Sequence, residues 1–447
     1  MAFAHTREPG DPRPWHELEE HLRETARLAE RFAGSYAPGW GHLAGLWHDL
    51  GKYQPRFQRM LELSQSQGYS DERVEHSIVG AAHAWRWNQQ AGPVLGLCIA
   101  AHHGGLKSWK GQVEGRLGSG PVKEWLDASE RHAPAALLEQ QVPTFPEWLT
   151  RDRTGLAMWI RFLFSALVDA DSLQTEAWDR GAERRVLDET PAILLGRLNE
   201  FLKKLERDSK PTVMRELRQT VLRDCRTAAA GAPGHFKLTV PTGGGKTLSA
   251  LAFALEHANL HGKRRVITVL PYTTILEQTV QVYRDALGAG TVVEHHSNVD
   301  VEKETLFNRQ ATENWDAPVI VTTSVQFLES LYANHKKRCR KLHNIADSVV
   351  ILDEVQTFPM EMMKPIQRAL DRLIEGFGVT IVHSTATQPQ LAHGTRAKEI
   401  ASNAAELFRA VSGRYVVSWP EDIREEQQRS WDMPALLEHL VGESDSV

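Results

Sequence analysis

Residues 236–247 read Phe-Lys-Leu-Thr-Val-Pro-Thr-Gly-Gly-Gly-Lys-Thr and decide the fold of the second half of the chain. Residues suited to a β-strand lead into a glycine-rich loop, after which Leu248, Leu251 and Leu255 recur at helical spacing. A strand, such a loop and a helix in this order form a phosphate-binding loop, whose backbone amides wrap the β-phosphate of a nucleotide. We therefore expect an ATP site here.

A second block, Asp353-Glu354, follows the apolar run 349–352 and completes the expected ATP site. Asp353 would hold Mg²⁺, and Glu354 would act as a catalytic residue that polarises the attacking water. Lys246 would neutralise phosphate charge, and Thr247 would offer its hydroxyl to Mg²⁺. The expected nucleotide-binding residues are Thr242, Gly243, Gly244, Gly245, Lys246, Thr247, Asp353 and Glu354.

Short apolar runs rich in β-branched residues continue on both sides of this loop. The predicted strands are residues 236–240, 265–270, 291–294, 319–322, 348–352 and 379–383. Helical segments separate most of them, which favours a mainly parallel sheet covered by helices. The expected fold class of this half is therefore an α/β domain with a phosphate loop and a mainly parallel sheet.

The first half shows helical periodicity instead. Predicted helices cover residues 15–33, 43–49, 72–88, 93–102, 121–139 and 155–173, and no segment alternates convincingly enough to be a strand. We expect an all-α domain over residues 12–205.

Histidines and aspartates recur through this helical half at near-regular spacing. The predicted metal ligands are His21, His48, Asp49, His76, His102, His103 and Asp171. One cluster per helix can project into a shared interior, as in helical-bundle metal sites. Imidazole and carboxylate suit Fe, Mn, Ni, Co or Zn, and two divalent transition-metal ions could activate water for phosphodiester hydrolysis.

A single histidine in this chain, such as His42, His83 or His132, is more often a helix-capping or surface residue than a metal ligand. The doublet His48-Asp49 is different, because a charge buried among Leu and Trp is costly without a compensating partner. Asp169 competes with Asp171 as the last ligand. Since residues two apart on a helix point in different directions, we expect only one of them to bind metal, and favour Asp171.

Composition limits the possible classes of protein. A chain of 447 residues should hold two or three domains, and a net charge of −5 requires any nucleic-acid contact to come from local patches. The three cysteines are far apart, which suits a reducing cytosol and excludes a Cys-based zinc site. Neither a signal sequence nor a long apolar stretch is present, so we expect a cytoplasmic protein with no membrane partner.

The ligand set resembles the HD phosphohydrolase superfamily, named after the doublet seen here as His48-Asp49. His21 and Asp171 match the family's early His and late Asp, while His76 and the pair His102-His103 resemble the expanded set of two-metal HD nucleases. The resemblance also implies that Lys52 is a catalytic residue near the scissile phosphate.

The second half resembles the first RecA-like domain of superfamily-two helicases. Thr273-Thr274 and Thr323-Ser324 resemble the motifs that touch the nucleic-acid backbone in that family. Asp353-Glu354 matches the Mg²⁺ motif, with Gln356 where many relatives carry His. Residues 384–387 resemble the motif that couples ATP state to strand binding, and Gln219 is a candidate adenine-sensing residue.

An HD nuclease ahead of a helicase core is similar to the CRISPR-associated nuclease-helicases of type I systems. The resemblance implies single-stranded DNA as substrate, ATP with Mg²⁺ as helicase cofactor, and recruitment by a guide-RNA surveillance complex. The displaced strand would be nicked, then pulled in the three-prime to five-prime direction into the nuclease site. The expected regions are the HD nuclease domain (12–205), a helical linker (206–235), the first RecA-like domain (236–412) and the approach to a second one (413–447).

One departure from the family concerns the sequence after Thr387. The remaining 60 residues are too few for a second RecA-like domain, which would supply arginines that complete ATP hydrolysis. We expect ATP binding with weak or no autonomous hydrolysis and no translocation by this chain alone. A second polypeptide could supply the missing domain.

Two other classes of function remain open. One is an HD nucleotide phosphohydrolase regulated by an ATP-sensing domain, which would hydrolyse dNTPs or cyclic dinucleotides and leave single-stranded DNA intact. The other is a non-catalytic module that binds the surveillance complex, which would hold no metal.

Overall fold

The computed structural model describes residues 1–8, 10–67, 74–151, 155–184, 189–296, 306–385 and 397–412. It divides into two compact units, Met1–Ser402 and Asn403–Val447. In the second unit the described secondary structure is α19 (Ala404–Val411). The expected approach to a second RecA-like domain, residues 413–447, lies outside the described residues.

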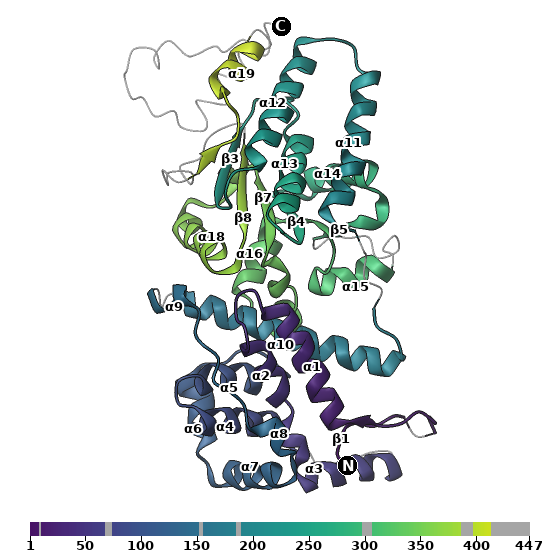
Figure 1. The fold of residues 1–447 in the computed structure, drawn as a ribbon, viewed down its shortest axis with the longest axis vertical. Coiled ribbons are helices and arrows are strands. Elements are labelled where there is room, and N and C mark those ends of the chain that lie inside the picture. Colours follow the sequence, from purple (N-terminus) through teal and green to yellow (C-terminus); the bar gives the residue numbers. More distant parts are fainter. Residues whose placement is uncertain are drawn as a thin grey trace, which may run out of the picture. The chain divides into compact units, whose positions relative to one another are not determined.

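The first half of the larger unit is mostly helical (Figure 1). Its helices are α1 (Leu18–Ala33), α2 (Trp40–Trp47), η1 (Leu50–Tyr53), α3 (Pro55–Gln67), α4 (Ser77–Trp87), α5 (Gly92–Ala101), η2 (Trp109–Val113), α6 (Glu114–Leu117), α7 (Gly120–His132), α8 (Ala135–Leu138), α9 (Glu147–Arg151) and α10 (Leu156–Arg180). α1 packs against both α2 and α10, and α4 packs against α5. This packing surrounds the positions of the predicted ligands.

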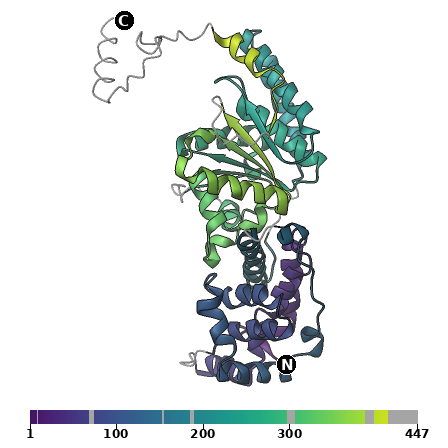
Figure 2. The same cartoon turned by 90° about the vertical axis from the view of Figure 1, so that its left-hand side faces the viewer.

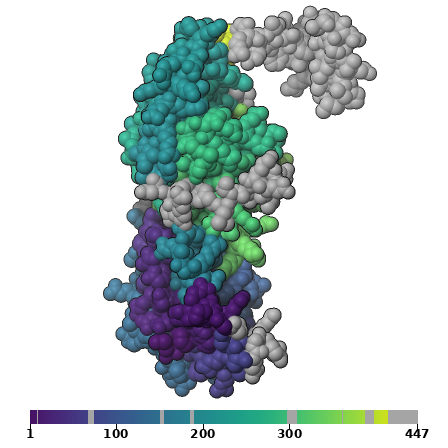
Figure 3. All heavy atoms as spheres, turned by 90° about the vertical axis from the view of Figure 1, so that its right-hand side faces the viewer, coloured from purple at the N-terminus to yellow at the C-terminus, as the bar shows by residue number. Residues whose placement is uncertain are grey.

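Several details differ from the sequence expectation. α3 was not expected, and the helix expected over residues 72–88 begins at Ser77. The strands β1 (Phe3–His5) and β2 (His16–Glu17) form an antiparallel pair before α1, where we expected no strand. Pro134 separates α7 from α8, where one helix was expected, because proline disfavours helical backbone at the residue before it. α10 continues to Arg180 rather than ending near Leu173. Figure 3 shows the purple residues of this hairpin and α1 on one face of the helical half.

Two helices, α11 (Pro191–Asp208) and α12 (Val213–Ala229), lead into a parallel sheet. Its strands are β3 (His235–Thr239), β4 (Arg265–Leu270), β5 (Val292–His295), β6 (Val319–Thr323), β7 (Ser348–Asp353), β8 (Thr380–Thr385) and β9 (Lys398–Glu399). Within the described residues they pair in the order β5-β6-β4-β7-β8-β3-β9. The six strands expected from the sequence are all present, and the expected fold class is confirmed.

Helices cover both faces of this sheet (Figures 1 and 2). They are α13 (Lys246–Leu260), α14 (Thr273–Leu287), η4 (Ala289–Thr291), α15 (Leu306–Asn314), α16 (Ser324–Tyr332), α17 (Lys336–Cys339), η5 (Leu342–Ile345), η6 (Val355–Thr357), η7 (Met360–Met362) and α18 (Met363–Phe377). α13 and α14 cover one face of the sheet, and α11 and α12 pack against these two helices. α16 and α18 cover the other face.

The hydrophobic core runs without a break from the helical half into the sheet domain. Phe377, the last residue of α18, packs against Phe162 of α10 with ring centroids 4.0 Å apart. Phe32 of α1 stacks on His343 of η5 at 4.5 Å. Because α10 contributes to both halves, it is the element through which the two sites described below are held together.

Candidate metal centre and nucleotide site

Five helices bring the seven predicted ligands to one place. His21 lies on the buried face of α1, His48 ends α2, His76 precedes α4, His102 ends α5, and Asp171 lies on α10. Asp49 and His103 are the chain neighbours of His48 and His102. Helix ends suit this role for His48 and His102, because each projects from a well-packed helix while its ring reaches past the last turn.

Asp49 lies between two groups of histidines. Its Oδ2 is 3.4 Å from His48 Nε2 and 3.5 Å from His21 Nε2. Its Oδ1 is 3.3 Å from His102 Nε2 and 3.5 Å from His76 Nε2. The ligand atoms of each group, His21–His48–Asp49 and Asp49–His76–His102–His103, all lie within 4.8 Å of one another. One carboxylate therefore faces both groups.

Asp171 adjoins the first group. Its Oδ1 is 3.6 Å from His48 Nε2 and 3.8 Å from His21 Nε2. Burial alone would raise the pKa of Asp171, but hydrogen bonding from His48 and the charge of Lys336 hold it well below its usual range. The same two aspartates, Asp49 and Asp171, outweigh the effect of burial on His48 and raise the pKa of that imidazole to about 9.

Backbone and side-chain acceptors fix the tautomers of the deepest histidines. His48 Nδ1 donates to Gly45 O at 2.7 Å, and His102 Nδ1 donates to Ile99 O at 2.7 Å. His21 Nδ1 donates to Gln174 Oε1 at 2.6 Å. In each case Nε2 is the ring atom directed into the cluster, where a metal ion would take the place of a proton, which is how ligating histidines are oriented in metalloproteins.

The residues present fit divalent ions. His21 Nε2 and His48 Nε2 face each other at 3.1 Å, and His76 Nε2 and His103 Nε2 at 2.5 Å. Asp49 Oδ1 and His102 Nε2 are buried without a hydrogen-bond partner among the described residues. Converging lone pairs and orphaned buried atoms are costly unless a cation satisfies them.

Lys52 is buried beside the cluster and is 3% exposed. Its Nζ is 2.7 Å from Asp49 Oδ2 and donates to Ala4 O of β1 at 3.1 Å. Burial alone would raise the pKa of Asp49, but Lys52 and His48 hold it well below its usual range. Lys52 is thus well placed to stabilise the metal-free carboxylate, and its contact with a phosphate stays a prediction.

Asp169 and Asp171 point in different directions, as expected from their spacing. Asp169 Oδ1 accepts from Arg340 Nε at 2.7 Å, and its Oδ2 accepts from Asn314 Nδ2 at 3.0 Å. Both partners belong to the sheet domain. Asp169 therefore serves the contact between the two halves, while Asp171 faces the histidines.

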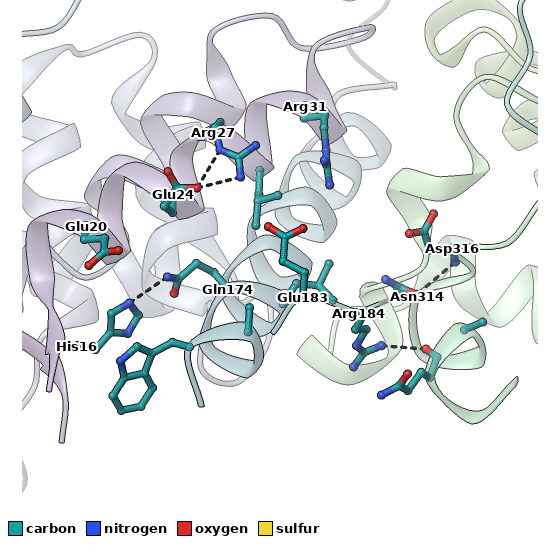
Figure 4. Close-up of a pocket in the computed structure, with 16 residues that line it drawn as sticks. His16, Glu20, Glu24, Arg27, Arg31, Gln174, Glu183, Arg184, Asn314 and Asp316 are labelled. Carbon is teal, nitrogen blue, oxygen red and sulfur yellow. Dashed lines mark hydrogen bonds and ion pairs between the residues drawn. The ribbon is translucent and has the colours of Figure 1, made fainter. Parts of the chain in front are cut away.

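The sequence did not predict the residues that hydrogen-bond to His21 on the side away from the other ligands, Gln174 and, through it, His16. Gln174 Nε2 donates to His16 Nε2 at 2.9 Å, and the His16 ring stacks on Trp178 with centroids 4.8 Å apart (Figure 4). Burial lowers the pKa of His16 to about 3, so this ring is a neutral acceptor. Gln174 lies one helical turn beyond Asp171, a spacing that could have signalled it.

These residues border a cavity of about 340 Å³ between α1, α10 and α15. Figure 4 shows side chains of both charges around it, including Glu20, Arg27 and Arg184. The lining contains four carboxylates and three guanidinium groups, so neither charge predominates.

The phosphate loop lies between β3 and α13, as expected. Gly243 and Gly245 have φ of 82° and 84°, a left-handed conformation that glycine adopts without strain. Lys246 Nζ is 2.7 Å from Glu354 Oε1 and 4.0 Å from Asp353 Oδ1. Burial alone would raise the pKa of Glu354, but the hydrogen bond from Lys246 lowers it. To bind a triphosphate, Lys246 would have to leave Glu354 and Asp353.

β8 lies between β3 and β7, which brings the motifs together at the carboxyl ends of the strands. Glu354 N donates to Ser384 O at 2.9 Å. Thr385 Oγ1 donates to Gln356 Oε1 at 2.7 Å, and Gln356 Nε2 donates to Glu354 Oε2 at 2.5 Å. The expected coupling motif thus contacts the Glu354 carboxylate through Gln356, although its last residues, 386 and 387, lie outside the described residues.

A cavity of about 980 Å³ adjoins the phosphate loop. Gly243, Gly245, Lys246 and Thr247 line it on one side, and Gln219 of α12 lines it on the other. This volume can hold a nucleotide. The placement of Gln219 is compatible with the adenine contact expected from the sequence.

The four residues predicted to contact the nucleic-acid backbone lie at the carboxyl ends of two neighbouring β-strands. Thr273 and Thr274 open α14 after β4, and Thr323 precedes Ser324, which opens α16 after β6. β4 and β6 are neighbours, with Leu270 paired to Thr323. Two helix N-termini side by side offer backbone N–H groups suited to phosphates.

The fold and these two sites define a class of protein: a helical domain with a His/Asp metal-type centre, joined to a RecA-like helicase domain. Comparison with known proteins agrees. Residues 4–168 match the family described as "Cas3, HD domain", and residues 216–393 match "DEAD/DEAH box helicase". The chain therefore contains a part similar to each of the two domains of a CRISPR-associated nuclease-helicase, as the sequence resemblance indicated.

Individual relatives support the same assignment. The CRISPR-associated nuclease/helicase Cas3 of Haloferax volcanii is 30% identical over 187 residues, covering 36% of this chain and 20% of that protein. The crystal structure of T. fusca Cas3 shares the fold with a TM-score of 0.56 and 17% identity, covering 94% of this chain and 53% of that one. A chain of a CRISPR RNA-guided surveillance complex before nicking has a TM-score of 0.51 and 18% identity, covering 94% and 51%. This chain spans about half the length of these solved relatives.

The two families imply metal ions and ATP with Mg²⁺ as cofactors in general terms. The described part of the chain includes no helix long and apolar enough to span a bilayer.

Proposed function

We propose that this protein is a metal-dependent nuclease for single-stranded DNA, coupled to an ATP-dependent helicase domain, that degrades foreign DNA in type I CRISPR interference. The observation that carries the proposal is the convergence of six side chains into two ligand groups that share Asp49, with Asp171 beside the first group. Two divalent transition-metal ions, one per group, would activate water and stabilise the leaving oxygen of a phosphodiester.

The chain's own residues would prepare this chemistry. His21, His48 and His102 present oriented Nε2 atoms, Asp49 is shared between the groups, and Lys52 is the cation beside the expected phosphate. The proposed partners are single-stranded DNA and a guide-RNA surveillance complex. The second is supported by the similar chain whose structure is described as a CRISPR RNA-guided surveillance complex. The three free, buried cysteines fit the cytoplasm as the proposed location.

The helicase half would bind ATP with Mg²⁺ through the phosphate loop, Asp353 and Glu354. The described residues supply one RecA-like domain and therefore one wall of the ATP site. We propose that a polypeptide of residues 1–447 binds ATP, hydrolyses it slowly, does not translocate alone, and needs the opposite wall from a second polypeptide or domain. Rapid ATP turnover stimulated by single-stranded DNA would contradict this.

Cleavage of circular single-stranded DNA in Mn²⁺, Ni²⁺ or Co²⁺ tests the nuclease proposal. The wild-type chain should cut it, Asp49→Ala should not, and Lys246→Ala should cut it normally because the ATP site is separate. Hydrolysis of dNTPs or cyclic dinucleotides with intact single-stranded DNA would instead favour a nucleotide phosphohydrolase.

A further inference from the structure

A short segment of the helicase domain lies directly against the metal centre. Leu106 N donates to Asn334 O at 2.8 Å, and Lys336 N donates to Gly104 O at 2.9 Å. Between these bonds Gly105 and His335 form an antiparallel bridge. Since residues 104–106 follow His102 and His103 directly, the helicase segment 334–336 supports the turn that carries two predicted ligands.

The same segment reaches the opposite end of the ligand set through a side chain. Lys336 Nζ is 3.0 Å from Asp171 Oδ2, while Asp171 Oδ1 faces His48 and His21. The two carboxylate oxygens therefore have separate partners. A lysine on Oδ2 restrains the rotation of the carboxylate and keeps Oδ1 directed at the histidines.

Buried polar contacts anchor this segment on α10. Asp169 is fully buried and is bonded to Arg340, four residues after Lys336. His343 N donates to Ser165 Oγ at 3.0 Å, one turn before Asp169. Breaking such buried pairs is costly, so the segment is held at a fixed position along α10.

The backbones approach so closely that the sequence must have glycine at one position. A Cβ at Gly105 would lie 2.6 Å from Asn334 O and 3.1 Å from the Cα of His335, both backbone atoms. A Cβ at the neighbouring Gly104 would meet nothing within 4 Å. These adjacent glycines therefore provide a test position and its control.

We propose that residues 334–336 of the helicase domain are part of the nuclease centre: Lys336 is a positioning residue for Asp171, and the backbone of the segment positions the His102–His103 turn. The proposal rests on the metal-dependent function proposed above. It also gives the two activities a physical connection, because α16, which begins at the expected strand-contacting Ser324, ends three residues before His335. A bound DNA strand that moves α16 would also move segment 334–336, which supports the metal ligands.

The first test replaces the lysine by a side chain of similar length without charge. Mn²⁺ binding to the full chain, measured by calorimetry without DNA, should weaken about 10- to 100-fold in Lys336→Met. Lys337→Met, at the exposed neighbouring position, should bind like wild type, and Lys336→Arg should recover part of the affinity. With saturating Mn²⁺, Lys336→Met should lower kcat and leave KM for single-stranded DNA unchanged.

The second test separates the backbone support from the charge. Gly105→Ala should weaken Mn²⁺ binding about tenfold or more, because the added methyl forces segment 334–336 away. Gly104→Ala should leave it unchanged. Equal effects of the two substitutions would show that the turn does not depend on the helicase segment.

The outcomes distinguish this inference from the proposed function. If the wild-type chain neither binds Mn²⁺ nor cuts DNA, both proposals fail. If it does both and Lys336→Met behaves like Lys337→Met, only the positioning role fails. Tighter Mn²⁺ binding in Lys336→Met would show that Lys336 competes with the metal for Asp171. A raised KM with unchanged Mn²⁺ affinity would show that Lys336 contacts DNA instead. Either result would overturn the positioning role.

Discussion

Asp49→Asn should empty the metal centre more completely than any other single ligand substitution. Asparagine keeps the size of the side chain, so the change removes charge without leaving a cavity. Oδ1 and Oδ2 of Asp49 each lie within 3.5 Å of two histidine Nε2 atoms, in different ligand groups. Both ions would therefore lose an anionic ligand at once.

The size of the effect follows from this shared position. A catalytic ion contributes several kcal/mol of transition-state stabilisation, and about 4 kcal/mol corresponds to roughly a thousandfold in rate. Loss of both ions should lower single-stranded DNA cleavage by at least about a thousandfold. His103→Ala removes a ligand from one group only and should lower the bound metal from two ions to one.

Metal content of the purified protein, measured by mass spectrometry, and cleavage of circular single-stranded DNA provide the readouts. Asp127→Asn, an exposed carboxylate on α7, is the matched control and should retain wild-type metal content. A thermal melt in chelator confirms that Asp49→Asn folds. If Asp49→Asn retains two ions and cuts DNA at the wild-type rate, Asp49 does not join the two groups and the reasoning is refuted.

Three further substitutions test other parts of the structure. Lys246→Ala should abolish binding of a fluorescent ATP analogue, because Lys246 is the cation of the phosphate loop; wild-type affinity would contradict that role. Gln174→Leu removes the acceptor that orients His21 and should weaken Mn²⁺ binding about tenfold in calorimetry, whereas Gln174→Glu keeps the acceptor; equal losses would exclude the tautomer argument. Arg340→Ala leaves Asp169 buried without its cation and should reduce the free energy of unfolding by about 3–5 kcal/mol in denaturant titrations; a loss under about 1 kcal/mol would show that the pair is dispensable.

Sequence patterns predicted what local periodicity and motif order determine. The six core strands and the phosphate loop lie where apolar β-branched runs and glycine spacing placed them, and the resemblance to the two families is confirmed. The seven predicted ligands do come together, because each lies on or beside a helix that packs into the core of the helical half.

Contacts between distant segments could not be predicted in the same way. Lys336 and Asp171 are separated by 165 positions, and a lysine in a polar segment carries no signal of its partner. The hairpin with His16 was missed because two-residue strands show no alternation. The choice between Asp169 and Asp171 needed the position of Arg340, which depends on packing between the two halves.

Different residues of α10 contact the sheet domain and the histidines, and this limits how the sequence of such proteins can change. Ser165 and Asp169 serve the sheet domain, whereas Asp171 and Gln174 serve the histidines. Each inserted residue in a helix turns everything beyond it by about 100°. A single insertion or deletion between Asp169 and Asp171 would therefore separate the two roles at once, so we expect lineages to tolerate changes of length in the loops around α10 and never within these ten positions.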